Sequence, residues 1–218
     1  MLENKRVMKI LERLEALFPS NWKTKSDDPF RELIRTILSQ NCSDKLSARA
    51  FERLQQKFLI TPEILANVKP TDIMQLIKCA GLYRTKSFRI VNVSKIVLDW
   101  FKGDLKEVLK LPFDQARETL MSIPGIGEKT ADVMLCFCAD FPVIPVDTHI
   151  NRVTKRLGIV KNRRAGYEVI RTTLEALIPT NDRRKAHILL ITLGRKYCKA
   201  RKPSCTICPL SDLCPKLI

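Results

Sequence analysis

The chain has 218 residues, and its 39 Lys and Arg residues against 23 Asp and Glu residues give a net charge of +16. That length supports one large domain or two compact lobes with real cores, and the charge favours a polyanion as partner. No run of 18 apolar residues occurs, so the sequence excludes a membrane-spanning helix.

The first six residues lead into an amphipathic pattern and not into an apolar signal segment. We therefore expect a protein of the cytoplasm or of a nucleoid-like space. Thiols stay reduced there, so the eight cysteines are interpreted as ligands or free thiols before disulfides.

All the elements that we predict are helices, because no segment shows sustained alternation of apolar and polar residues. The first helix is expected over 2–17, and the next four begin at Asp28-Pro29, Ser43-Asp44, Thr61-Pro62 and Pro70-Thr71. Three more are expected over 86–101, 105–111 and 113–121, and another begins after residue 127. The last three are expected over 148–157, 163–177 and 182–196. Residues 22–27 are predicted as a linker and 82–86 as a loop. The inward stripes include Leu17 in the first helix, Leu46 in the third and Trp100 in the long helix over 86–101.

A tight turn, Pro124-Gly125-Ile126-Gly127, separates two of these helices. Its two glycines can take positive φ and let another backbone come close. The turn amides and the start of the following helix can hold an anion, most simply a phosphate. Lys129 lies in the first turn of that helix. Further along, Asp147 follows an extended Pro-Val pair as an N-cap, and backbone N–H groups there favour its ionised form.

These residues resemble the helix-hairpin-helix motif and following Asp of the endonuclease III family of DNA glycosylases. The resemblance rests on Ile-Pro-Gly-Ile-Gly-Glu-Lys-Thr-Ala at 123–131 and on Val-Asp-Thr-His-Ile-Asn-Arg-Val at 146–153. It implies that Lys129 is the amine nucleophile and Asp147 the catalytic carboxylate. The hairpin alone also occurs in non-catalytic DNA-binding proteins, with a solvated Lys and a plain N-cap Asp. Lys129, Asp147 and the C-terminal cysteines together favour the enzyme.

The family fold is all-α and has two lobes with a DNA cleft between them. By resemblance, residues 28–138 form a helical bundle that contains the helix-hairpin-helix motif. Residues 1–27 and 139–218 then form a discontinuous iron–sulfur lobe.

Four cysteines gather near the C-terminus with six, two and five residues between them: Cys198, Cys205, Cys208 and Cys214. Four thiolates in one short loop predict a metal site, which could hold either an iron–sulfur cluster or a zinc ion. The spacing resembles the family's [4Fe–4S] loop, in which all four ligands are used and the cluster is structural. The resemblance places Lys199, Arg201 and Lys202 where the loop would direct them at phosphates. The other four cysteines are interpreted as small core residues, although Cys42 lies in a loop that would meet DNA.

Further DNA contacts follow from the resemblance. The amides of Gly125, Ile126 and Gly127, with Thr130, would hold a backbone phosphate. Leu82 and either Gln40 or Asn41 would fill the stack that a flipped base leaves, although core packing is an equal reading of Leu82. His149 would bind a phosphate or be a structural His, and His187 is structural. Arg152, Lys155 and Arg156 form a basic face expected to contact DNA.

The predicted function is that of a monomeric, bifunctional DNA glycosylase and AP lyase of base-excision repair. By resemblance it excises oxidised, ring-saturated pyrimidines from double-stranded DNA, forms a Schiff base on Lys129 and cuts the strand by β-elimination. One alternative is a glycosylase for T/G or U/G mismatches or for oxidised guanine. A second is a non-enzymatic DNA-binding or redox-sensing iron–sulfur protein, which would not need the Lys129 and Asp147 pair.

Overall fold

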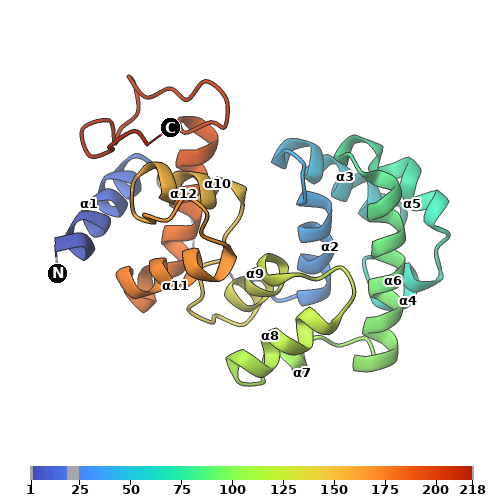
Figure 1. Ribbon diagram of the computed structural model, residues 1–218. Coiled ribbons are helices and arrows are strands. Elements are labelled where there is room, and N and C mark those ends of the chain that lie inside the picture. Colours follow the sequence, from blue (N-terminus) through green and yellow to red (C-terminus); the bar gives the residue numbers. More distant parts are fainter. Residues whose placement is uncertain (1, 19–24, 218) are drawn as a thin grey trace. The chain divides into compact units, whose positions relative to one another are not determined.

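The structure is a computed structural model that describes residues 2–18 and 25–217. Within these ranges every regular element is a helix and no strand occurs, as the sequence predicted (Figure 1). The chain divides into two compact units, which are residues 25–140 (unit 2) and residues 1–24 with 141–218 (unit 1). No helix in the described ranges has both the length and the apolarity that crossing a membrane requires.

Unit 2 consists of helices that pack around the long helix α6 and the buried helix α2. Its elements are α2 (Pro29–Ser39), α3 (Asp44–Lys57), α4 (Pro62–Asn67), α5 (Pro70–Ile77), the 3₁₀ helix η1 (Lys78–Ala80), α6 (Tyr83–Phe101), α7 (Lys106–Leu109), α8 (Phe113–Ser122) and α9 (Glu128–Cys138). Helices α4 and α5 lie along α6, whereas α2 contacts α3 and α9 (Figure 1).

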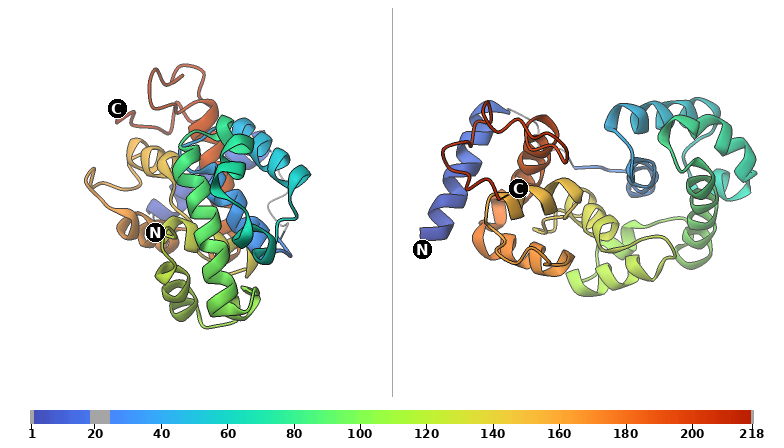
Figure 2. Two further views of the ribbon diagram at one scale, coloured as in Figure 1. Left: turned by 90° about the vertical axis from the view of Figure 1, so that its right-hand side faces the viewer. Right: turned by 45° about the horizontal axis from the view of Figure 1, so that its top comes forward.

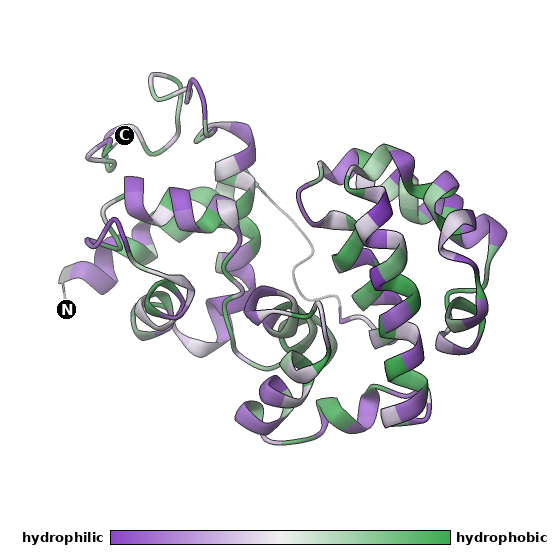
Figure 3. Ribbon diagram, turned by 45° about the vertical axis from the view of Figure 1, so that its right-hand side comes forward, coloured by the Kyte–Doolittle hydropathy of each residue, from purple (hydrophilic) through white to green (hydrophobic). Residues whose placement is uncertain are grey.

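The local sequence explains where these helices begin. Asp28 caps α2, since its carboxylate accepts the Arg31 N–H at 2.9 Å. Thr61 caps α4 through the Ile64 N–H at 3.4 Å. Three helices start with a proline whose missing N–H would have no partner in the first turn, namely α2, α4 and α5. Apolar residues then repeat along the ribbons, and Figure 3 shows hydrophobic segments alternating with hydrophilic ones.

Unit 1 is formed by the N-terminal and C-terminal segments of the chain together. Its elements are α1 (Leu2–Leu17), α10 (Thr148–Arg156), α11 (Tyr167–Leu177), η2 (Thr180–Asp182) and α12 (Arg183–Lys196). Their apolar faces bury one core, which extends to Leu210 in the C-terminal loop. Arg6 of α1 donates to Leu157 O at 2.6 Å and to Leu213 O at 3.0 Å. Arg13 adds a bond to Pro209 O at 3.1 Å, so α1 and the C-terminal loop lie side by side (Figure 2).

Two predicted boundaries are wrong. The loop predicted over 82–86 is helical from Tyr83, because Lys86 and Ser87 are buried and continue the inner face of α6. The helix predicted over 163–177 begins only at Tyr167. Before it, Asn162 forms a turn in which its side chain accepts the Arg164 N–H and its carbonyl accepts the Ala165 N–H.

Three side chains predicted to face the core are exposed. Leu17 and Trp100 lie in the last turns of their helices, where the apolar stripe runs past the neighbouring elements, and Leu46 lies in the first turn of α3. Part of the linker predicted over 22–27, namely residues 22–24, lies outside the described residues.

Candidate active site and cysteine loop

The hairpin segment, residues 113–138, consists of α8, a tight turn and α9. Gly125 has φ +94°, and a Cβ there would lie 2.7 Å from Nε of Arg89, so the position requires glycine. Gly127 differs from the prediction, because its φ of −102° is extended and nothing would contact a Cβ there within 4 Å. Ile126 is buried, and its N–H bonds to Ile123 O at 3.0 Å, which closes the turn.

A buried ion pair connects α8 and α9, the two helices on either side of this turn. Arg117 of α8 donates to Asp132 of α9 through Nε at 2.6 Å and through Nη2 at 3.4 Å. The Asp132 side chain is fully buried, so its charge depends on this partner. The angle at which α9 leaves the turn is therefore set by an ion pair in addition to apolar packing.

Lys129 lies in the first turn of α9 and is half-buried. By helix geometry the first N–H groups of α9 have no partner inside the helix, so this end favours negative charge. Glu32 of α2 lies within electrostatic range of Lys129. Burial raises the pKa of Glu32, and the charges of Arg35 and Lys129 oppose that rise. The sequence analysis missed Glu32, which resembles an ordinary acidic residue in the first turn of a helix.

Asp147 caps α10 as predicted, since its Oδ1 accepts the Ile150 N–H at 2.8 Å. The extended backbone before it is fixed by side chains from α11 and α12. Glu175 accepts the Ile144 N–H at 3.0 Å and the Tyr167 hydroxyl accepts the Val146 N–H at 3.2 Å. His187 Nδ1 lies 2.7 Å from Pro145 O, which agrees with the structural role predicted for it. Lys129 belongs to unit 2 and Asp147 to unit 1.

Gln40 and Asn41 follow α2 directly but have different environments. Gln40 is half-buried, accepts Arg89 Nη1 at 2.6 Å and donates to the Thr130 hydroxyl at 3.4 Å. Asn41 is exposed and has φ +49°. Arg89 thus contacts both Gln40 and the backbone at Gly125, a link that no sequence pattern indicated because the residues are far apart in the chain.

Leu82 precedes α6 and also has a left-handed backbone, with φ +45°. Its side chain is 58% exposed, which rules out the core-packing interpretation. The two exposed positions predicted to enter the DNA stack, Asn41 and Leu82, therefore share an unusual conformation for non-glycine residues.

The basic face predicted on α10 is half-buried, and its cations donate to backbone carbonyls. Arg152 donates to Cys198 O at 2.8 Å and to Gly194 O at 3.1 Å. Lys155 donates to Ala165 O at 2.9 Å. Arg156 donates to Lys199 O at 2.7 Å and to Ala200 O at 3.1 Å. These three cations bind backbone carbonyls of unit 1 that lie in the last turn of α12 or outside the helices.

His149 is packed in the same region. Its Nδ1 lies 3.0 Å from Nη2 of Arg152, and a Cβ at Gly194 would lie 2.8 Å from the His149 Cβ. Burial lowers the pKa of His149, and the nearby charge of Asp147 opposes this shift only in part. A half-buried imidazole that already contacts Arg152 suits the structural alternative better than phosphate binding.

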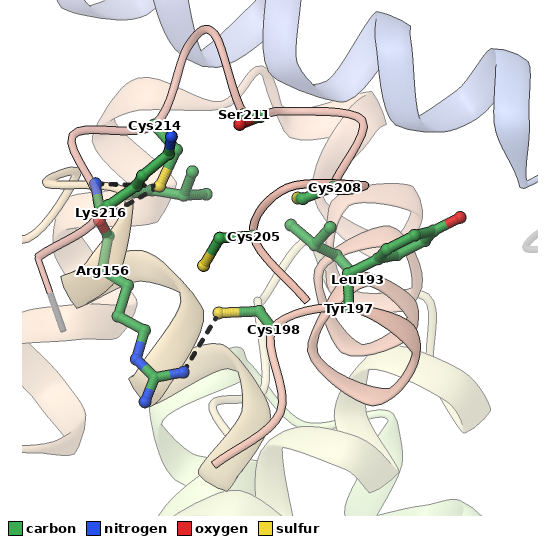
Figure 4. Close-up of a pocket in the computed structure, with 10 residues that line it drawn as sticks. Arg156, Leu193, Tyr197, Cys198, Cys205, Cys208, Ser211, Cys214 and Lys216 are labelled. Carbon is green, nitrogen blue, oxygen red and sulfur yellow. Dashed lines mark hydrogen bonds between the residues drawn. The ribbon is translucent and has the colours of Figure 1, made fainter. Parts of the chain in front are cut away.

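The cysteine loop, residues 197–217, brings together the four cysteines that the sequence singled out. Cys198, Cys205, Cys208 and Cys214 line one pocket with Arg156, Leu193 and Tyr197, and Figure 4 shows the labelled side chains around it. Arg156 Nη1 lies 3.6 Å from Cys198 Sγ, and the Lys216 N–H lies 3.3 Å from Cys214 Sγ. Each of these two sulfurs therefore has an N–H group of the surrounding chain beside it.

The donor set also suits a cluster. The pocket is lined by four cysteine thiols, which are the ligands that an iron–sulfur cluster uses. Four thiols around a common pocket suit a larger centre with one thiolate per iron. Burial raises the pKa of Cys208 and of Cys214, and the charges of the neighbouring thiols add to that rise. The residues present therefore fit an iron–sulfur cluster.

The remaining predicted groups lie as follows. Lys199, Arg201 and Lys202 are exposed on the cysteine loop. Thr130 is buried beside Lys129. Of the scattered cysteines, Cys136 and Cys138 are core residues as predicted, whereas Cys42 and Cys79 are half-buried. Burial raises the pKa of Cys138 to about 12, so that thiol stays neutral.

Comparisons with known proteins agree with this geometry. Residues 34–180 match the HhH-GPD superfamily of base excision DNA repair proteins, and residues 198–214 match the iron-sulfur binding domain of endonuclease III. The chain is 35% identical to endonuclease III of Bacillus subtilis over 98% of this chain and 94% of that protein. It is 36% identical to endonuclease III of Thermotoga maritima over 90% of this chain and 86% of that protein.

Solved structures give the same result. A trapped covalent endonuclease III–DNA intermediate matches with a TM-score of 0.85 and 33% identity, over 99% of this chain and 97% of that one. A non-covalent endonuclease III–DNA complex matches equally well. A thermostable thymine-DNA glycosylase matches with a TM-score of 0.78 over 98% of this chain and 97% of that one, but at 20% identity this likeness concerns the fold alone.

Proposed function

The chain belongs to the endonuclease III family within the HhH-GPD superfamily of base excision DNA repair proteins, and we propose that Lys129 and Asp147 carry its chemistry. It is a DNA glycosylase and AP lyase, and it binds DNA. The observation that carries the proposal is the position of Lys129. This half-buried amine follows directly after a phosphate-binding type of turn, on a helix whose direction a buried ion pair fixes.

The turn supplies the first part of the mechanism. The Ile126 N–H is already bonded, so the proposed donors to a DNA phosphate are the amides of Gly125 and Gly127. Ile126 instead anchors the turn in the core of unit 2. A phosphate bound there positions the damaged strand without reading its sequence.

Lys129 supplies the nucleophile. Its neutral amine attacks the anomeric carbon, a C–N bond to lysine forms, and the glycosidic bond breaks as the base leaves with a proton. The positive charge near a helix N-terminus disfavours Lys⁺ and so favours the neutral amine. The C1′–O4′ bond of the sugar ring then opens, O4′ takes up a proton, and the lysine nitrogen forms an iminium with C1′. This iminium acidifies the neighbouring C2′–H. Loss of that proton breaks the C3′–O bond and cuts the strand 3′ to the lesion.

Asp147 supplies the carboxylate that stabilises the developing positive sugar and helps to deprotonate Lys129. Its N-cap bond and the three side chains that hold the backbone of residues 144–146 support this role, because they fix the position from which the carboxylate projects.

Asn41 and Leu82 are the groups proposed to fill the vacated stack. Both are exposed, whereas Gln40 is occupied by Arg89 and Thr130. Asn41 would pair with the orphaned base and Leu82 would insert between neighbouring bases. Gln40 instead links the end of α2 to the hairpin segment.

The chain carries a [4Fe–4S] cluster, and Cys198, Cys205, Cys208 and Cys214 are proposed to hold it. The cluster supplies a structural crosslink and no substrate chemistry. With the loop anchored, Lys199, Arg201 and Lys202 are exposed to contact DNA phosphates. The carbonyl bonds from Arg152 and Arg156 hold the same loop from within.

The proposed substrates are oxidised, ring-saturated pyrimidines and abasic sites in double-stranded DNA, acted on by a monomer in a reducing compartment close to DNA. Saturated rings are non-planar and stack poorly, so they cost less free energy to flip than normal bases. Leu82 and Asn41 can fill the gap opposite either purine.

Single-turnover rates on five duplexes test this substrate assignment. Thymine glycol and dihydrouracil should react faster than uracil opposite G, thymine opposite G and oxidised guanine opposite C. Faster release of any of the last three would assign the chain to a mismatch or oxidised-guanine activity. It would leave the Lys129 mechanism intact.

A further inference from the structure

Lys86 is a buried lysine of unit 2 that has no part in the chemistry above. It lies in the first turn of α6, and its side chain is only 2% exposed. Its ammonium donates to Leu38 O at 2.8 Å and to Ala80 O at 2.8 Å. A buried ammonium with carbonyl partners on two other elements is rare, because the charge must be removed from water.

The two carbonyls lie just before the two positions proposed to enter the DNA. Leu38 is in the last turn of α2, and the chain continues through Ser39 and Gln40 to Asn41. Ala80 is the last residue of η1, and the chain continues through Gly81 to Leu82. One ammonium therefore joins the supports of both loops, which are separated by some forty residues in sequence.

Both loops depend on such support. Asn41 and Leu82 have φ of +49° and +45°, a backbone region that costs free energy for residues other than glycine, most of all for a bulky one. Conformations of this kind persist only where surrounding structure enforces them. The Leu82 side chain cannot provide that enforcement because it is 58% exposed. The Lys86 ammonium, and the Lys86 N–H bonded to Leu82 O at 2.9 Å, hold the backbone instead.

We infer that Lys86 is a positioning residue that couples the two loops, so that Asn41 and Leu82 enter the duplex as one rigid pair. Lysine suits this role because its three N–H donors can satisfy two carbonyls that approach from different elements. The inference rests on the proposed function, since it assigns Lys86 to the gap-filling step of that reaction.

The test replaces Lys86 by methionine, which has a similar length and no donors. Lys95→Met on the same helix is the control, because Lys95 is exposed. Base release from a thymine glycol duplex is compared with strand cleavage at an abasic site in a single-stranded oligonucleotide. The single strand has no stack to fill. Lys86→Met should slow the duplex reaction by about tenfold or more, as expected for the loss of charged hydrogen bonds, and leave the single-strand reaction unchanged.

Equal losses on both substrates, or no loss on either, would overturn the inference, because a residue that only stabilises the fold does not distinguish them. Should Lys86→Met fail to fold, Lys86→Arg keeps the charge and displaces the donors, and the same selective loss is expected. A double-mutant cycle with Leu82→Ala adds a further readout. Lys86→Met should cost less in that background, and simple additivity would contradict the coupling.

Different measurements would refute the proposed function and this inference. Wild-type protein that leaves both substrates intact would refute the function. Fluorescence of 2-aminopurine opposite a tetrahydrofuran site then still reports loop insertion without catalysis. Lys86→Met should reduce the fluorescence change on binding, and an unchanged signal would refute the inference.

Discussion

The hairpin segment and the cysteine loop are both proposed to contact DNA, but different forces hold them. The hairpin segment is two helices around an apolar turn, closed by the buried pair of Arg117 and Asp132. The cysteine loop has no regular helix; arginine side chains hold its backbone, and four thiols line one pocket. Burial therefore shapes the first region, whereas the second is proposed to depend on ligation.

This difference separates two tasks. The hairpin segment presents the amine proposed to do the chemistry, and the cysteine loop presents exposed cations proposed to bind the DNA backbone. Substitutions in the hairpin segment should therefore change rates, whereas substitutions in the cysteine loop should change affinity. The predictions below test that division.

Lys129→Ala should have the largest effect. Base release and strand cleavage should fall together by about three orders of magnitude or more, because one amine serves both steps. Duplex affinity should remain close to that of the wild type. Retained strand cleavage at the wild-type rate would show that the hairpin segment does not supply the nucleophile.

Asp147→Asn should slow base release by about two to four orders of magnitude, since the carboxylate acts directly on the reacting sugar. The thermal midpoint should change little, because Asn can still accept the Ile150 N–H. Asp147→Ala is the matched comparison and should lose about 1 kcal/mol of cap stability as well. Near-normal turnover of Asp147→Asn would assign the carboxylate role to another residue, with Asp44 and Asp140 tested next.

Cys208→Ser should act on the other region. The wild-type protein should contain iron and acid-labile sulfide in equal amounts, and the variant should lose both. Its duplex affinity should fall by about tenfold or more as the loop loses its anchor. Cleavage of a single-stranded abasic oligonucleotide should persist. Cys79→Ser in unit 2 is the control, and an equal loss of iron in that variant would contradict the assignment of ligands.

The double variant Lys199→Ala with Lys202→Ala should bind duplex DNA with a weaker salt dependence. The slope of log binding constant against log salt concentration should become less negative by about one to two, because each phosphate contact contributes about 0.9 to it. Lys110→Ala, another exposed lysine, provides the control. If both variants kept the wild-type slope, the cysteine loop would have no contact with phosphates.

The smallest effect concerns Glu32. Burial raises its pKa in the folded protein, so the folded state holds a proton that the unfolded state releases as pH rises above about 4.5. Glu32 therefore stabilises the folded state at low pH, and this stabilisation is lost as the pH rises through the raised pKa of Glu32. Glu32→Gln should lack this decrease, which denaturant unfolding at several pH values will measure against Glu52→Gln. Parallel curves for the two variants would contradict the buried position of Glu32.

The parts of the fold that apolar periodicity determines could be predicted from the sequence. The starts of α2, α3, α4 and α5 lie where caps and prolines placed them. The start of α6 could not, because Lys86 resembles a surface residue until its carbonyl partners are known. Apolar periodicity treats a lysine as polar and carries no information on the groups that accept hydrogen bonds from its ammonium.

The same limit applies to the candidate site. Lys129, Asp147 and the four cysteines are marked by local motifs, and the cap at Asp147 follows from its neighbours. Arg89 and Glu32 were missed because only the packing of helices brings them to the turn and to Lys129. The carbonyl partners of the α10 cations could not be predicted, because sequence does not show which backbone carbonyls lie near a side chain in the fold.

The central claim is that one amine, that of Lys129, forms the covalent bond to DNA. Reduction of the reaction with borohydride, followed by proteolysis and mass spectrometry of the trapped complex, tests it directly. The trapped sugar should lie on the peptide that contains Lys129, and Lys129→Ala should give no adduct on the same thymine glycol duplex. An adduct on another lysine or on the N-terminal amine, or trapping of Lys129→Ala in wild-type yield, would contradict the account.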